Sequence, residues 1–257
     1  MKIDTRSEIN NRCLLSKVPE VTFFFWVIKI MATTVGETAA DFLNVHLDFG
    51  LSNTSYVMAA LLLAALCVQI GTRKYIPWTY WLSVVLISVV GTLISDNLVD
   101  NLGVSLQTTT VAFGGALVIT FIVWHAAEKT LSVHTVFTVR RELFYWLAIL
   151  FTFALGTSAG DLVAEHLQLG YLPSAAIFGS AIVVVAIAHY VFRLNGILAF
   201  WISYVLTRPL GASFGDFLSQ PAANGGLGLG ATETSTLFLA AILGMVVYQT
   251  IGRKNSY

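Results

Sequence analysis

Four aspartates recur at a fixed distance behind four tryptophans, and they are the residues of this sequence best suited to bind a cation. In every copy nine residues separate Trp from Gly, and three more lead to a small residue followed by Asp. The four copies run from Trp26 to Asp41, Trp81 to Asp96, Trp146 to Asp161 and Trp201 to Asp216. Carboxylate oxygens are the ligands that hard divalent cations such as Mg²⁺ and Mn²⁺ prefer. We therefore take the four aspartates as candidate cation-binding residues and as candidate metal ligands.

Further oxygen-bearing side chains stand close to the first aspartate. Glu37 precedes Asp41 by four residues, and Thr33 precedes Glu37 by four, so all three share one face of a helix. The position of Glu37 is occupied in the other copies by Thr92, Thr157 and Ala212. A simpler interpretation is that the aspartates only end or cap their helices at a membrane surface. End caps would not require the same spacing from Trp to Asp in four copies.

Two basic residues, Lys29 and Arg208, lie inside apolar stretches and break the symmetry of the repeat. A charge buried in a membrane must be paired, so we expect each of them to meet an intramembrane carboxylate. Lys29 lies about two helical turns from Glu37, and Arg208 lies about two turns from Asp216. The five carboxylates outnumber the two cations, so a cluster of them would attract cations and repel anions.

A second set of polar residues recurs near the ends of the alternate apolar stretches. It consists of Gln or His followed four residues later by Arg or Lys, at Gln69 and Arg73, His125 and Lys129, His189 and Arg193, and Gln249 and Arg253. We expect this set at the inner mouth of the bundle, where a neutral imidazole could bind a metal or relay protons. The alternative is a histidine ring at the lipid headgroups. His46 and His166, each five residues after an aspartate, form a weaker candidate site outside.

The elements that position these residues are membrane spans. The chain is 56% hydrophobic and 11% charged, whereas soluble domains carry about 25% charged residues. A spanning helix needs about 20 mostly apolar residues. Eight stretches qualify, at 22–43, 55–72, 78–98, 108–128, 142–163, 173–192, 197–218 and 232–251. The fold class expected is therefore an all-α polytopic membrane bundle, a single transmembrane domain over 21–254 preceded by a polar tail over 1–20.

The basic residues indicate how the bundle is oriented. With eight spans, every Lys and Arg except Lys29 and Arg208 falls on one side of the membrane. Positively charged loops stay inside, so we expect both termini in the cytoplasm. Fifteen residues of helix rise about 22 Å, which places each aspartate in the outer third of a hydrocarbon core about 30 Å thick. The Gly and small positions let two membrane helices approach closely.

The chain is expected to be four tandem helix hairpins, at about 21–75, 76–138, 139–196 and 197–254. On the Trp, Gly and Asp positions quoted above, it resembles a family of bacterial inner-membrane proteins built from four tandem copies of a two-span repeat of unknown function that contains a tryptophan. The resemblance covers residues 17–254. It implies the eight-span architecture and location in the inner membrane, and it brings no established chemistry.

The function most consistent with these features is secondary transport of a small cation, with a divalent metal such as manganese as the first candidate. Protonation of the carboxylates would release the metal, so export in exchange for protons is a natural mechanism. The alternatives are a cation channel, a non-transporting membrane sensor or scaffold, and a transporter of a small organic cation. No nucleotide-binding loop, catalytic triad or HExxH motif is present, so we expect neither an enzyme nor a cofactor. Zero net charge argues against nucleic acid as a partner, and the lipid bilayer is the expected surrounding.

Overall fold

The computed structural model of the chain describes residues 16–43 and 50–254. In this part of the chain, eight helices are long and apolar enough to cross a membrane. They are α2 (Phe23–Asp41), α3 (Leu51–Gly71), α4 (Pro77–Asp96), α5 (Leu106–Glu128), α6 (Val139–Asp161), α7 (Tyr171–Tyr190), α8 (Gly196–Ser219) and α9 (Ala231–Lys254). Short π-helical segments, η2 (Asn97–Asn101) and η4 (Leu162–His166), and single 3₁₀ turns, η3 (Val133–Thr135) and η5 (Ala222–Asn224), complete the described elements. The predicted all-α bundle of eight spans is confirmed.

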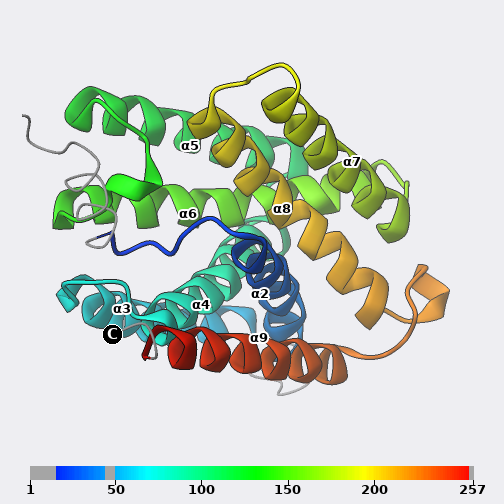
Figure 1. The fold of residues 1–257 in the computed structure, drawn as a ribbon. Helices are drawn as coiled ribbons and strands as arrows, with labels where there is room; N and C mark the ends of the chain where they lie inside the picture. Colours follow the sequence, from blue (N-terminus) through cyan, green and yellow to red (C-terminus); the bar gives the residue numbers. More distant parts are fainter. Residues whose placement is uncertain (1–15, 44–49, 255–257) are drawn as a thin grey trace, which may run out of the picture.

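The first helix of every repeat lies inside the bundle and the second lies outside. The four inner helices pack as a closed ring, α2 on α4, α4 on α6, α6 on α8 and α8 back on α2. Figure 1 shows these helices meeting near the centre of the molecule, with α3, α5, α7 and α9 around them. Burial agrees, because half or more of each inner span is buried and less than a quarter of each outer span. The inner helices are therefore the ones that can position a site away from lipid.

Each outer helix packs mainly on the inner helix of the next repeat. The pairs are α3 on α4, α5 on α6, α7 on α8 and, across the ends of the chain, α9 on α2. A hydrogen bond between the hydroxyls of Thr38 and Ser235, 2.6 Å long, joins α2 to α9. The last repeat thus completes the first, and the four repeats form one cyclic unit.

The repeated glycines are the contact points of the inner ring. A Cβ added at any of them would collide with the next inner helix, at a side chain seven residues after that helix's repeat tryptophan. The pairs are Gly36 with Ser88, Gly91 with Phe153, Gly156 with Arg208, and Gly211 with Thr33. The glycines therefore set the close approach of the inner helices that the Gly-x3-small pattern predicted.

Aromatic side chains fill the ring at the end where the repeat tryptophans lie, which we call the Trp end. Trp81 and Trp146 are buried there, and the hydroxyls of Tyr80 and Tyr145 lie 2.6 Å apart in the same layer. Tyr204 is also fully buried. Among the described residues, these buried rings make up the core of this half of the molecule.

The segment 16–22, which precedes α2, lies across the Trp end and is drawn in blue in Figure 1. Its anchor is Lys17, whose ammonium makes a 2.6 Å ion pair with Glu142 at the start of α6 and donates to the carbonyl of Ile70 on α3. Both charged side chains are almost completely buried. The described end of the predicted tail is thus part of the packed structure.

Candidate functional site

Arg208 lies at the centre of the inner ring and reaches all three other inner helices. Its guanidinium makes a 2.9 Å ion pair with Glu37 on α2 and donates to the hydroxyls of Thr92 on α4 and Thr157 on α6. A second nitrogen donates to the carbonyl of Thr33 at 2.6 Å. The side chain is 0% exposed. One residue of the fourth repeat therefore ties together the other three.

The three side chains that meet the guanidinium occupy one position of the repeat. Glu37, Thr92 and Thr157 each stand eleven residues after their tryptophan, and Ala212 occupies that position on α8. The hydroxyl of Thr92 also lies 3.4 Å from the Glu37 carboxylate. The repeat thus builds a layer of oxygen atoms around the axis, and the alanine leaves space on the helix that supplies the cation.

One turn further along the inner helices lies the acidic layer. Carboxylate oxygens of Glu37, Asp161 and Asp216 lie within 4.8 Å of one another, close enough to hold one metal ion. These residues come from α2, α6 and α8, which belong to three different repeats. Asp41 and Asp96 stand at the same repeat position as Asp161 and Asp216, and both lie close enough to Glu37 for their charges to interact. We call the end of the molecule that carries this layer the Asp end.

The aspartates of α4 and α6 lie where the α-helix changes to a π-helix. Asp96 and Asp161 are each the last α-helical residue of their helix, and the π-helical segments η2 and η4 follow them. Because the backbone continues as a π-helix, neither aspartate caps or terminates its span. Such π-helical turns occur frequently at functional sites.

Lys29 makes no ion pair with a carboxylate of the described residues, which differs from the expected arrangement. Its ammonium donates to the Thr207 hydroxyl at 2.5 Å and lies 4.0 Å from the centre of the Tyr204 ring. The Phe153 ring is 5.2 Å away on another side. The reason is the ring packing, because α2 presents Lys29 to the aromatic layer of α8 and α6 rather than to its own Glu37. Arg208 likewise pairs with Glu37 on α2, not with Asp216 on its own helix.

Thr33 contributes to the ring without facing the acidic layer. Its hydroxyl donates to the carbonyl of Ile30 at 2.6 Å, and its side chain fills the space beside Gly211. Its backbone carbonyl, not its hydroxyl, receives the Arg208 guanidinium. The sequence grouped Thr33 with the oxygen ligands, and the structure gives it a packing role.

The repeated Gln and His residues lie on the outer helices, where each has its own neighbours. The Gln69 amide donates to Glu142 at 3.3 Å, and Gln249 accepts from the Tyr75 hydroxyl at 3.2 Å. The ring of His189 contacts the carbonyl of Leu194, and His125 is exposed. Gln69 and Gln249 accept from Thr79 and Tyr75 beside the start of α4, whereas His125 and His189 lie on α5 and α7, so the four share no common contact among the described residues.

The weaker outer pair of histidines is not assembled in the described part of the chain. His166 is exposed and its ring lies 2.5 Å from the amide of Gln107. His46 falls outside the described residues. Two residues that sequence reasoning missed are Lys17 and Glu142, whose ion pair joins the segment before α2 to α6. The signal for them was weak, because neither belongs to a position that recurs in the four copies.

A family model described as Repeat of Unknown Function (DUF347) matches the chain four times, over residues 24–75, 79–130, 144–195 and 199–255. No curated protein and no solved structure is detectably similar to the chain. Each match covers one inner helix and the outer helix that follows it. The resemblance inferred from the repeated Trp, Gly and Asp positions is therefore confirmed, and the chain belongs to this family.

Proposed function

We propose that this member of the DUF347 repeat family is a secondary transporter of a small cation, with a divalent metal such as manganese as the first candidate. The observation that carries the proposal is the meeting of Glu37, Asp161 and Asp216 within 4.8 Å, inside a bundle of membrane-spanning helices. A carboxylate within a membrane is costly and marks an ion pathway or a proton relay. The cation would be held by these three side chains, with Asp41 and Asp96 completing the acidic layer.

The chemistry of the layer favours a hard cation. The side chains able to coordinate a cation there are carboxylates, and the other oxygen atoms within the inner ring belong to hydroxyl and carbonyl groups. The buried hydroxyls of Ser95 and Ser213 lack a hydrogen-bond partner in the described structure. Ser95 directly precedes the aspartate of α4, and Ser213 lies within one turn of the aspartate of α8. Oxygen donors of this kind suit Mn²⁺ or Mg²⁺, whereas Cu(I) prefers sulfur.

The charge balance supports exchange of the metal for protons. With all groups ionised, the charges within the apolar spans sum to three negative, because Lys29 and Arg208 stand against Glu37 and the four repeat aspartates. Three protons would neutralise the layer, and so would one divalent cation together with one proton. Exchange of one divalent cation for two protons therefore keeps the layer neutral in both states, which a membrane interior favours.

The filled Trp end favours a transporter over an open pore. A channel requires a continuous aqueous path, whereas the axis beyond the acidic layer is occupied by Arg208, Lys29 and the aromatic residues. A site that opens to one side at a time is consistent with such a closed half. Repeats that surround a central site are common among transporters.

We further propose a bacterial inner-membrane location with both termini and the Trp end in the cytoplasm. The support is the distribution of basic residues, since Arg73, Lys129 and Arg193 all follow outer helices at the Trp end. In this orientation the acidic layer faces the outer half of the membrane, and outward release of the metal corresponds to export.

The first test is metal flux in proteoliposomes that contain the full-length protein. Mn²⁺, Zn²⁺, Mg²⁺ and Ca²⁺ are compared with and without a proton gradient. We expect saturable flux of one divalent cation, accelerated by the gradient, and a loss of at least about tenfold in Asp161→Asn, because one ligand of three is removed.

The matched control is Glu233→Gln, which removes an exposed carboxylate from the first turn of α9, at the same end of the molecule. We expect this variant to transport at the wild-type rate, because an exposed charge is screened by solvent and salt. Flux of no cation by folded wild-type protein would contradict the proposal. Equal losses in the two variants would place the effect in surface charge rather than in the acidic layer.

A further inference from the structure

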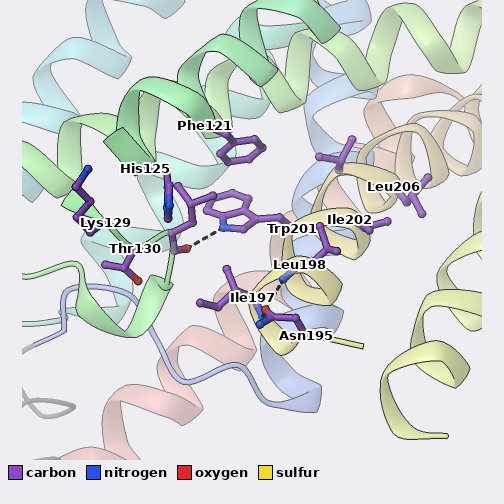
Figure 2. Close-up of a pocket in the computed structure, with 12 residues that line it drawn as sticks. Phe121, His125, Lys129, Thr130, Asn195, Ile197, Leu198, Trp201, Ile202 and Leu206 are labelled. Carbon is purple, nitrogen blue, oxygen red and sulfur yellow. Dashed lines mark hydrogen bonds between the residues drawn. The ribbon is translucent and has the colours of Figure 1, made fainter. Parts of the chain in front are cut away.

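A groove of about 540 Å³ lies outside the inner ring, at the Trp end, between the last turns of α5 and the first turns of α8. Trp201 lies at its base, and the indole N–H donates to the carbonyl of Leu131, an interaction drawn as a dashed line in Figure 2. That hydrogen bond is 2.9 Å long. Phe121 packs against the same indole at 4.8 Å between ring centres. The base of the groove is therefore apolar, because its one polar atom already has a partner.

The groove is apolar along most of its length and polar at one end, which we call its mouth. Ile202 and Leu206 line its deeper part, and His125 and Lys129 stand at the end nearest the helix termini. From Asn195 to Leu206 the helix rises roughly 16 Å, which is about half of a hydrocarbon core 30 Å thick. A ligand that fills it must be a long apolar chain with a polar group at one end.

The mouth carries positive charge that no carboxylate of the described residues neutralises. The nearby acid, Glu128, is engaged by Arg141 at 2.8 Å and by Arg140 at 3.4 Å. Lys129 has no ion-pair partner among the described residues and is exposed, as is His125. An anionic headgroup is complementary to this mouth, and basic pockets at the cytoplasmic ends of membrane helices are known to bind such lipids.

The groove is not a general consequence of the repeat. The equivalent position between α9 and α4 is closed by direct packing of the two helices. The equivalent position between α3 and α6 is bridged by Lys17, whose ammonium donates hydrogen bonds to the carbonyl of Ile70 on α3 and to the carboxylate of Glu142 on α6. The position between α5 and α8 thus differs from these two copies in being open and in carrying a free basic side chain.

We propose that this groove binds one anionic phospholipid, with its phosphate at Lys129 and His125 and one acyl chain along α8. The lipid would cover the apolar face of α8 beside the repeat tryptophan and hold α5 and α8 together at the Trp end. This role is separate from the cation site, which lies on the inner helices toward the other end of the molecule.

The test is native mass spectrometry of the full-length protein in detergent, titrated with palmitoyl-oleoyl phosphatidylglycerol or phosphatidylethanolamine. We expect one phosphatidylglycerol to stay bound at concentrations where phosphatidylethanolamine does not. Lys129→Gln should raise the concentration for half occupancy about fivefold, the effect of one basic residue near an anionic surface. Ile202→Trp, which fills the groove, should abolish the tightly bound lipid.

Arg73→Gln is the matched control, because Arg73 occupies the position of Lys129 in the first repeat and is exposed. We expect this variant to bind phosphatidylglycerol as the wild type does. Equal retention of the two lipids by the wild type, or retention of phosphatidylglycerol by folded Ile202→Trp, would overturn the proposal. An equal effect of Arg73→Gln and Lys129→Gln would also overturn it, since that result indicates general charge attraction.

Discussion

At the scale of single residues, the ion pair of Arg208 with Glu37 dominates the centre of the molecule. The two side chains are 0% and 8% exposed and lie 2.9 Å apart. Burying two charges is favourable only when each is fully hydrogen-bonded, and Arg208 meets this condition through partners on three helices. The pair therefore determines how the inner helices are arranged around the axis.

Replacing Glu37 by Gln should lower the free energy of unfolding by about 3 kcal/mol or more, because it leaves the Arg208 guanidinium buried without its ion-pair partner. Unfolding of purified protein in mixed micelles by added SDS measures this change. The double variant Glu37→Gln with Arg208→Met should regain part of the loss, since an apolar side chain of similar length replaces the unpaired cation.

Glu128→Gln provides the comparison for that measurement. Its partner Arg140 is largely exposed and Arg141 is partly exposed, so both charges stay hydrated and the change should cost about 1 kcal/mol or less. Losses of equal size in Glu37→Gln and Glu128→Gln would show that the central pair contributes no more than this partly exposed pair.

The sequence indicated which residues would carry charge into the membrane, but not how they would pair. Buried Lys, Arg and Glu are evident in an apolar stretch because they are costly there. Glu37 and Arg208 are 171 residues apart, and their contact depends on α8 packing against α2 at the closure of the ring. Counting turns along one helix could not identify Glu37 as the partner of Arg208, and the carboxylate expected beside Lys29 is replaced by the Thr207 hydroxyl and aromatic rings.

At the scale of elements, the repeated glycines explain why four helices can surround so narrow an axis. Each glycine receives a side chain of the next inner helix, and Gly156 receives the stem of Arg208 itself. A methyl group at these positions would push two backbones apart. The pattern Gly-x3-small is thus both the packing surface of the ring and the reason that Arg208 reaches its partners.

Gly211→Ala should destabilise the protein by about 1–3 kcal/mol, because the new methyl group collides with Thr33. Gly115→Ala is the matched change on the lipid-facing helix α5, where an added Cβ meets nothing within 4 Å. That variant should be neutral or more stable by up to about 1 kcal/mol, since Ala is the better helix former. SDS unfolding compares the two, and a Gly211→Ala variant as stable as Gly115→Ala would contradict the packing role.

At the scale of the whole molecule, the four repeats form a closed ring in which no repeat is complete alone. Every inner helix is covered by an outer helix of the preceding repeat, and the first is covered by the last. Hydrophobicity and the Trp-to-Asp spacing were sufficient to predict eight spans and four repeats. They were insufficient to predict that each outer helix packs on the inner helix of the next repeat. The reason is that lipid-facing helices such as α3 and α7 show no polar stripe that would mark the face in contact with protein.

Closure of the ring predicts a specific cross-link. In a background with Cys13 and Cys67 replaced by Ser, Thr38→Cys with Ser235→Cys should form a disulfide on oxidation, because the two hydroxyls they replace lie 2.6 Å apart. The chain should then migrate faster on a non-reducing gel. Ser174→Cys with Ser235→Cys, on α7 and α9, should remain reduced, since these helices cover different inner helices. Oxidation of only the second pair would show that α9 does not cover α2.

The packing of each outer helix on a neighbouring repeat also has a consequence for biosynthesis. A ribosome delivers α2 to the membrane before the other seven described spans, yet α2 has the lowest mean hydropathy of the eight, 1.2, and carries Lys29 and Glu37. The partners of both residues, Thr207 and Arg208, lie on α8, and the helix that shields α2 from lipid is α9. The nascent α2 must therefore be retained by the insertion machinery, or hold its charges at the membrane surface, until α8 and α9 have been translated.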